Sequence, residues 1–208
     1  MDRRTRQRAR TVDEIVDSAE ALVLAADPAG FTVADIARGL GMTAGALYRY
    51  FPGRDAILAR VQSRCLTSLG EALGAVPPGE PWGRLLGLAG AFVAWTRREP
   101  ARYELLARML ADPRPLVDGD ALSLVVPAGA AALAQVAAAW SDVGDPDPAA
   151  RALSLFAAVH GAMQVDKLAR FAPNAAGPGL ARWNVERMLL GAGAPPEAIG
   201  AAAPWEVE

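Results

Sequence analysis

The stretch from Thr43 to Phe51 combines small, hydroxyl-bearing, aromatic and basic side chains at helical spacing. Leu47 and Phe51 are four residues apart, so in a helix both pack inward on one face. The residues turned toward the opposite face are Thr43, Ala44, Gly45, Tyr48 and Arg49. Small residues at the front of a short helix permit close approach, while hydroxyl and guanidinium groups bind phosphates or base edges. The pattern predicts a helix that can enter the major groove of DNA.

Two capping boxes predict where the first two helices begin. In each box a hydroxyl residue is followed three residues later by a carboxylate, so that the two side chains satisfy free backbone amides. The first box begins at Thr11 and predicts a helix over about residues 12–26. The second begins at Thr32 and predicts a helix of about eight residues. Both helices precede the stretch that starts at Thr43.

Glycine and proline mark the boundaries of the next two helices. Residues 39–42 read Gly-Leu-Gly-Met, which predicts a tight turn in which glycine can adopt a left-handed backbone. Thr43 then caps a third short helix, and Pro52-Gly53 ends it. From Arg54 apolar residues recur at three-and-four spacing along a long fourth helix. Two short helices around a glycine turn are the arrangement of a helix-turn-helix.

The sequence between residues 32 and 58 closely resembles the DNA-binding signature of the TetR family of bacterial transcription regulators. The resemblance covers about residues 11–60. It rests most directly on residues 47–51, Leu-Tyr-Arg-Tyr-Phe, followed by basic Arg54 at the start of the long helix. The resemblance implies an all-α fold, in which an N-terminal three-helix helix-turn-helix domain is joined by a long helix to a helical bundle for ligand binding and dimerisation.

The resemblance implies DNA contacts by Thr32, Thr43, Ala44, Gly45, Tyr48, Arg49, Tyr50 and Arg54. The threonines would bind phosphate, and the alanine and glycine would lie at base edges. The two tyrosines would contact the backbone or a thymine methyl group, although surface aromatics covering the fourth helix also fit. Arg49 is at a position that varies in the family, where it could read guanine or contact phosphate or solvent. Arg54 replaces the usual lysine and would bind a phosphate.

Helical periodicity continues through most of the remaining chain. The predicted helices are approximately 81–98, 101–111, 118–141, 148–170 and 178–190. Pro127 should kink or restart the third of these. The segment 192–208 is rich in Gly, Ala and Pro and lacks periodicity, so a flexible tail is expected. The predicted domains are 1–56 for DNA binding, with a basic N-terminal arm, 57–191 for ligand binding and dimerisation, and 192–208 for the tail.

The resemblance also implies two partners besides a double-stranded palindromic operator. One is a second copy of the chain, which would pack through the helices at about 148–170 and 178–190. The other is an unidentified small-molecule effector that releases the regulator, expected to be a repressor, from DNA. The side chains that could line its cavity are Trp82, Phe92, Trp95, Tyr103, Met109, Phe156, His160 and Met163. The same spacing also fits an ordinary core, and His160 also fits a satisfied core or interface residue.

Composition narrows the function classes. The chain of 208 residues is 52% hydrophobic and 21% charged, which fits a globular protein with a sizeable core. One cysteine and one histidine exclude an internal disulfide and the standard zinc ligand sets, and no cofactor is implied. No leader segment or stretch of about 18 apolar residues is expected to engage a membrane, so a cytoplasmic location is predicted.

The charge distribution and the motifs also indicate which classes of protein other than regulators the sequence fits. Five arginines and one acid in the first ten residues form a basic arm, which fits either phosphate binding or a solvated tail. No Ser/His/Asp arrangement, nucleotide loop or carboxylate pair is recognisable, so the chain is not expected to be an enzyme. The pattern also fits a DNA-binding architectural protein without ligand control, or a helical carrier of apolar compounds. Only the carrier would ignore DNA.

Overall fold

The computed structural model describes residues 2–25, 31–111, 116–117, 119–166, 179–201 and 205. Over these residues all regular structure is helical and no strand is present, which confirms the predicted all-α fold. The chain divides into two compact units. The first unit is Met1–Thr67 with Pro100–Gly129, and the second is Ser68–Glu99 with Ala130–Glu208. The first unit thus continues past residue 56, where the sequence predicts the DNA-binding domain to end.

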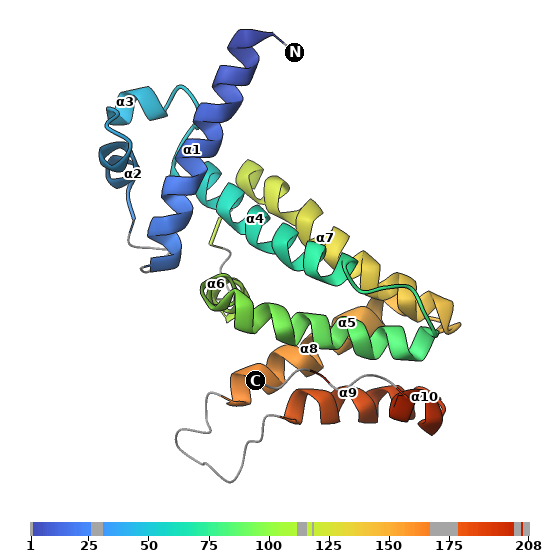
Figure 1. Ribbon diagram of the computed structural model, residues 1–208. Helices are drawn as coiled ribbons and strands as arrows, with labels where there is room; N and C mark the ends of the chain where they lie inside the picture. Colours follow the sequence, from blue (N-terminus) through green and yellow to red (C-terminus); the bar gives the residue numbers. More distant parts are fainter. Residues whose placement is uncertain are drawn as a thin grey trace. The chain divides into compact units, whose positions relative to one another are not determined.

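The helices are labelled in chain order in Figure 1. The first unit contains α1 (Arg3–Ala25), α2 (Val33–Gly39), α3 (Ala44–Leu47), α6 (Pro100–Ala111) and the beginnings of α4 (Arg54–Gly74) and α7 (Gly119–Asp142). The second unit contains α5 (Pro81–Arg98), α8 (Pro148–Asp166), α9 (Leu180–Gly191), α10 (Pro196–Ala201) and the ends of α4 and α7. The helices α5 to α9 therefore lie where the periodicity predicts them, within one or two residues at the described ends. The predicted positions 26, 118, 167–170 and 178 lie outside the described residues.

The start of α1 differs from the prediction. The helix begins at Arg3 instead of residue 12, so Thr11 lies inside it and is no cap. Arginine, alanine and glutamine are good helix formers, and no glycine or proline interrupts the first ten residues. Arg10 and Glu14 also form an ion pair one turn apart, with 3.2 Å between Nε and Oε1. Continuous helix propensity therefore outweighs the capping signal at Thr11.

Apolar side chains from all three N-terminal helices and α4 form the core of the first unit. Ile15 of α1, Ile36 of α2 and Leu47 of α3 are fully buried, as are Ile57 and Leu58 of α4. Each of the short helices α2 and α3 has too few residues to be stable alone, so this burial provides most of their stability. The core fixes the two short helices on α1 and α4.

Ion pairs join α1 to α4 and α6 inside the same unit. Arg64 of α4 donates to the carboxylates of Asp13, Asp17 and Glu20 on successive turns of α1. Arg102 of α6 binds the other carboxylate oxygen of Glu20, with Nη2 and Oε1 2.7 Å apart. The Glu20 side chain is only 13% exposed, so two arginines compensate one nearly buried carboxylate.

Aromatic residues join the aliphatic core of the second unit along α5. Trp95 is 1% exposed, and its indole Nε1 donates to Ser68 Oγ at 3.1 Å. The Phe92 ring lies 6.2 Å from Trp95 and stacks on Phe156 at 5.2 Å between centroids. The helices α8 and α9 pack against each other and against α5. Three aromatic rings of the second unit thus lie in contact along one side of α5.

The region after residue 191 differs from the predicted tail. Pro196–Ala201 form α10, which packs on α5 and buries Ile199. Beyond it, the Trp205 indole donates to the Leu86 carbonyl of α5 at 3.2 Å. A Cβ added at Gly90 would lie 2.7 Å from this ring, so Gly90 provides the space that Trp205 fills. The hydrophobic anchors are too widely spaced to show periodicity, which is why the sequence gives no signal for them.

Helix α7 corrects the expectation that no segment is apolar enough for a membrane. Among the described residues, Gly119–Asp142 is one helix that is long and apolar enough to cross a membrane, by length and composition only. One such helix is weak evidence for a membrane span. Only 17% of its apolar window is buried. The helix also continues through Pro127 without a restart. Leu122 and Val126 are among the large apolar side chains that it exposes.

Candidate nucleic-acid interface

The capping box of α2 has the geometry that the sequence predicts. The Thr32 hydroxyl accepts from the Asp35 amide at 3.2 Å, and Asp35 Oδ2 accepts from the Thr32 amide at 3.0 Å. The Thr32 hydroxyl also donates to Asp35 Oδ2 at 2.6 Å. Hydrogen bonds from the side chain and the backbone of Thr32, aided by Arg38, lower the pKa of the Asp35 carboxyl below its usual 3.8. The exposed Thr32 side chain is thus held in one orientation.

The turn and the cap that position α3 are also confirmed. Gly41 has a φ of +64°, the left-handed conformation that favours glycine. Thr43 precedes the four-residue α3, and its hydroxyl accepts from the Ala46 amide at 3.2 Å. Leu47 and Phe51 are 0% and 6% exposed, as the i, i+4 spacing predicts. The helix is shorter than expected, because residues 48–50 form turns instead of a further helical turn.

Gly45 is open toward solvent. A Cβ at this position would meet nothing closer than the Thr43 hydroxyl at 4.0 Å, and φ is not in the left-handed region. Neither packing nor backbone strain within the chain therefore requires glycine here. The small size of residue 45 leaves the surface of α3 free for close approach by a partner.

Tyr48 and Arg49 leave α3 on its exposed side. The Tyr48 side chain is 55% exposed, which is unusual for a large aromatic residue with a hydrophobic ring. Neither Tyr48 nor the Arg49 guanidinium has a hydrogen bond or ion pair to a residue that the structure describes. Both side chains are free to bind an external molecule.

Arg8 of α1 contacts the end of the α3 region, which the sequence did not predict. Its Nη2 donates to the Arg49 carbonyl at 3.0 Å. Its guanidinium carbon also lies 5.1 Å from the centre of the Tyr50 ring, within the range of a cation–π contact. The two partners are 41 and 42 residues away in sequence, and no local spacing indicates such a contact. Arg8 therefore fixes the half-buried Tyr50 from α1.

Arg54 has a structural role that the sequence did not indicate. Its Nε donates to the Phe31 carbonyl at 3.2 Å, and its guanidinium lies 4.6 Å above the Phe31 ring. Nη1 also bonds to Asp55 Oδ1 at 3.3 Å. With its side chain 30% exposed, Arg54 joins the segment before α2 to the start of α4.

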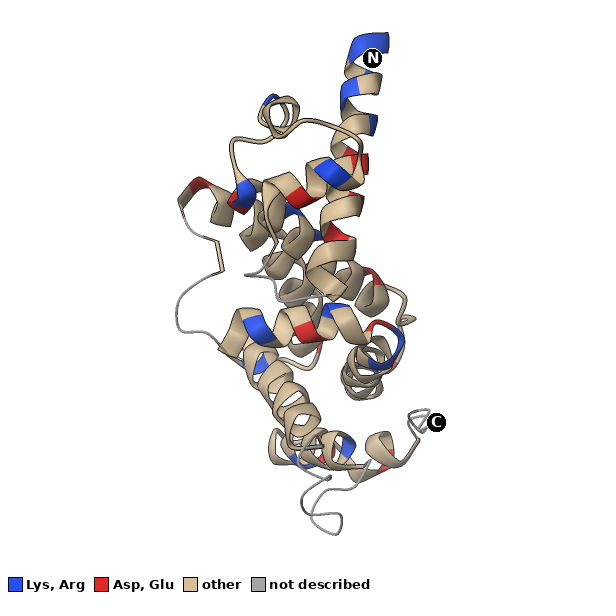
Figure 2. Cartoon of the chain, turned by 90° about the vertical axis from the view of Figure 1, so that its left-hand side faces the viewer, with Lys and Arg blue, Asp and Glu red and all other residues tan. Residues whose placement is uncertain are grey.

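The N-terminal end of α1 adds positive charge to the same unit. Figure 2 shows arginines along this end of the helix, with acidic residues further along. Residues 2–10 are all exposed. A helix with exposed arginines on its surface can neutralise phosphates. The basic arm is thus helical, continuous with the helix that supports α2.

The eight candidate ligand residues do not form one cluster. Phe92, Phe156 and His160 are stacked in series in the second unit, with 5.6 Å between the Phe156 and His160 ring centroids. Trp95 borders this stack, Met163 is half-buried one turn beyond His160, and Trp82 packs edge-on against Trp140 at 6.1 Å. Tyr103 and Met109 belong to the first unit. The aromatic rings of the stack contact one another directly.

Two family models match the chain. The model described as "Bacterial regulatory proteins, tetR family" matches residues 15–61. The model described as "Tetracyclin repressor-like, C-terminal domain" matches residues 85–188, which is half of the chain. No curated protein matches.

Solved structures show the same fold along nearly the whole chain. A regulatory protein with 25% identity has a TM-score of 0.70, covering 92% of this chain and 100% of its own. A tetR family transcription regulator from Shewanella sp. PV-4 has 18% identity and a TM-score of 0.65, with coverages of 87% and 96%. The flavonoid-responsive regulator FrrA has 20% identity and a TM-score of 0.62, with coverages of 88% and 97%.

Proposed function

Because the chain belongs to the tetR family of bacterial regulatory proteins, we propose that it is a repressor that leaves a palindromic operator when a small molecule binds. Regulators of this family bind DNA, typically act as dimers with small-molecule ligands, and are in general not enzymes. The observation that carries the proposal is the surface of α3. There an open Gly45 lies beside Tyr48 and Arg49, whose side chains have no partner among the described residues.

The proposed contacts are those of Thr32, Thr43, Ala44, Gly45, Tyr48, Arg49, Tyr50 and Arg54. Ala44 and Gly45 allow the helix to approach base edges, and Tyr48 and Arg49 provide the direct contacts. Arg8 fixes Tyr50, and Arg54 keeps one exposed edge for phosphate while it joins Phe31 to α4. Arg54 therefore combines a structural contact with a DNA contact.

The experiment measures binding of the purified protein to fragments of its own promoter and to scrambled DNA at physiological salt. We expect a preference for one palindromic fragment, and loss of that preference in Tyr48→Ala and Arg49→Ala. Arg38→Ala is the matched control, because Arg38 is an exposed arginine of α2 outside the proposed contacts. A chain that ignores every fragment at every salt concentration would be a carrier instead. A chain that binds DNA but responds to no metabolite would be an architectural protein.

Dimerisation is proposed through α8 and α9, which correspond to the predicted helices 148–170 and 178–190. Leu153 of α8 is 55% exposed, Trp183 of α9 is 56% exposed, and Val165 adds a third apolar side chain. Gly161 of α8 has open space around its Cβ position. Exposed large apolar residues together with small ones suit close packing of helices from two copies.

A pair of charge substitutions tests this interface. Leu153→Asp should convert the dimer to a monomer, because a carboxylate would be buried against a second copy without a partner. Leu110→Asp is the matched control, since Leu110 is 50% exposed on α6 in the other unit. Light scattering measures the molecular mass of each variant and so distinguishes a dimer from a monomer. A monomeric Leu110→Asp protein, or a dimeric Leu153→Asp protein, would exclude the α8–α9 interface.

The effector is proposed to bind in the second unit, within the predicted domain 57–191. The stack of Phe92, Phe156 and His160 supports this proposal, because parting these rings would open an apolar site with one polar group. A ligand that favours a conformation with α4 displaced would change the separation of the two α3 helices in a dimer. Aromatic compounds are the first to screen, since a neighbour of the same fold is named flavonoid-responsive.

The five tryptophans allow a direct test, because all of them lie in the second unit. In protein labelled with 5-fluorotryptophan, an effector bound at the stack should shift the fluorine resonance of Trp95, whose ring borders Phe92. The same compound should release the promoter fragment from the wild-type protein. Phe156→Ala should weaken both effects, whereas Ser154→Ala on the exposed face of α8 should not weaken ligand binding. The proposed location of the protein is the cytoplasm, where its DNA would be.

A further inference from the structure

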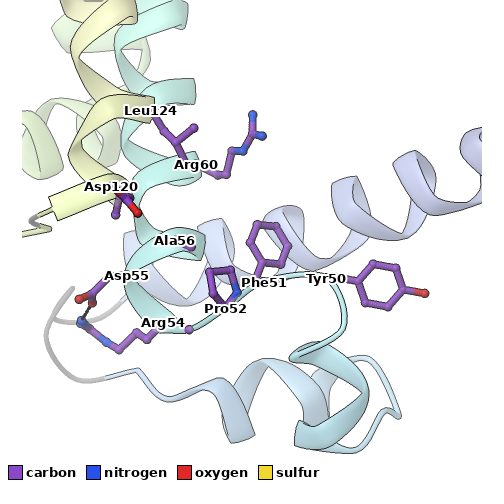
Figure 3. Close-up of a pocket in the computed structure, with 11 residues that line it drawn as sticks. Tyr50, Phe51, Pro52, Arg54, Asp55, Ala56, Arg60, Asp120 and Leu124 are labelled. Carbon is purple, nitrogen blue, oxygen red and sulfur yellow. Dashed lines mark hydrogen bonds and ion pairs between the residues drawn. The ribbon is translucent and has the colours of Figure 1, made fainter.

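The first unit contains a groove of about 610 Å³ beside the loop that follows α3 (Figure 3). Its walls come from residues 50–53, the first two turns of α4 and the start of α7. None of the eight candidate ligand residues lines it. The volume lies within the range of about 300–1,000 Å³ that is typical of small-molecule sites.

The groove is mainly apolar on one side. Tyr50, Phe51 and Pro52 present rings in succession (Figure 3), and Ala121 and Leu124 of α7 also line the groove. Flat rings offer stacking contacts to another ring. The shape and chemistry of this surface therefore suit a planar, ring-containing compound.

A single arginine gives the groove an available positive charge. Of the three arginines of α4, Arg54 and Arg64 form ion pairs, whereas Arg60 has no hydrogen bond or ion pair to the part of the chain that the structure describes. Figure 3 shows that the Arg60 side chain extends away from Asp120, on the same side of α4 as Phe51. Asp120 instead lies at the first turn of α7, where a carboxylate is stabilised by the helix dipole. Asp55, the other carboxylate of the lining, is paired with Arg54, so the Arg60 guanidinium is the lining cation without a described partner.

We propose that this groove binds an aromatic carboxylic acid, with its ring on the apolar wall and its carboxylate on Arg60. A guanidinium binds a carboxylate through two parallel hydrogen bonds, which would orient the ring. The ring would pack between the loop residues and Ala121 of α7. A neutral aromatic compound would gain only the apolar contact.

Binding there would weaken DNA binding, an effect that rests on the function proposed above. Tyr50 and Arg54, both assigned to the DNA surface, also line the groove. A bound carboxylate brings negative charge next to groups that would meet phosphates, and like charges repel. The groove would thus be an effector site in the DNA-binding unit, separate from the one proposed in the second unit.

Calorimetric titration of the full chain with 1-naphthoate, in the absence of DNA, tests the site. Arg60→Gln should weaken 1-naphthoate binding by about fivefold, as expected for a partly exposed ion pair, and should not change the weaker binding of neutral 1-naphthamide. Ala121→Trp should abolish binding of both, because the new ring fills the groove. Ala138→Trp is the matched control, since Ala138 is exposed on the same helix outside the groove.

Circular dichroism verifies that each variant is folded. If Ala121→Trp does not fold, Arg60→Gln still tests the site. The site is excluded if 1-naphthoate does not bind the wild-type protein, or if it binds Arg60→Gln and Ala121→Trp as tightly as wild type. If 1-naphthoate binds as expected but leaves the affinity for the promoter fragment unchanged, the regulatory role is excluded. If it binds as expected and the chain ignores promoter DNA, the proposed function fails while the acid site stands.

Discussion

The two compact units expose their candidate functional groups in opposite ways. In the first unit Tyr48 and Arg49 project from a short capped helix into solvent and have no described partner. In the second unit Phe92 and Phe156 are stacked on each other, with His160 continuing the stack. A surface that binds a stiff DNA duplex must have its contact groups exposed before binding. A small-molecule site can instead be filled by its own side chains until a ligand displaces them. The contrast predicts that changes in the two units will affect different measurements.

The largest effect should come from removing a core leucine in either unit. Leu47→Ala and Leu88→Ala each delete a side chain that is at most 1% exposed, which costs about 2–5 kcal/mol of unfolding free energy. Leu47→Ala should also abolish promoter binding, because Leu47 is the buried anchor of the four-residue α3. Urea unfolding and DNA binding are measured on both proteins. Loss of DNA binding by folded Leu88→Ala protein would show that the units are not functionally distinct.

Substitution of Arg49 decides between its two possible contacts. If Arg49 reads guanine, Arg49→Ala should cost about 1–3 kcal/mol of discrimination at one base pair and leave binding to scrambled DNA nearly unchanged. If it binds phosphate, affinity should fall for all sequences, and the slope of log affinity against log salt should decrease by about one. Binding to the promoter fragment and to scrambled DNA over a range of salt concentrations separates these outcomes. Arg38→Ala serves as the control for net charge.

Helix caps provide a matched comparison between the units. The Thr43 hydroxyl caps α3, and the Glu80 carboxylate caps α5 by accepting from the amides of Trp82 at 3.1 Å and Gly83 at 2.6 Å. Thr43→Ala and Glu80→Ala should each cost about 1 kcal/mol of stability. Only Thr43→Ala should also weaken DNA binding, and Thr43→Ser should restore it. Equal losses of DNA binding in both variants would contradict the assignment of α3.

The smallest effect concerns acid stability of the first unit. The pKa of Asp35 is lower in the folded protein than its usual 3.8, chiefly because Thr32 donates hydrogen bonds to the carboxylate. Its stabilising contribution is therefore complete above that value and is lost as the pH falls below about 4 through the folded pKa. Asp35→Asn should reduce stability at pH 7 and show a smaller decrease between pH 5 and 3. Urea midpoints measured at several pH values test this, and an unchanged pH dependence would contradict it.

The sequence predicted those features that depend on neighbours within a few residues. Thr32 and Thr43 cap their helices and Gly41 forms the turn as predicted, because caps and turns are local, and the buried pair Leu47 and Phe51 follows from helical spacing. The helices α5 to α9 were also placed closely, since proline and glycine mark several of their ends.

Features that depend on distant parts of the chain were not predicted. Arg8 reaches the α3 region across 41 residues, and Arg54 binds a carbonyl 23 residues before it. Trp205 lies on α5 at a distance of 119 residues from Leu86. No periodicity in the sequence encodes such contacts, because they arise only when separate helices pack. The groove beside α3 was missed for the same reason.

The open position at Gly45 has a consequence for how this protein can evolve. A side chain could be added there without displacing any neighbour, since the nearest atom to a new Cβ is 4.0 Å away. Mutations at residue 45 can therefore accumulate at little cost to folding while they alter which molecules α3 accepts. Recognition could diverge between paralogues through single substitutions on an unchanged scaffold, without a compensating change in the core.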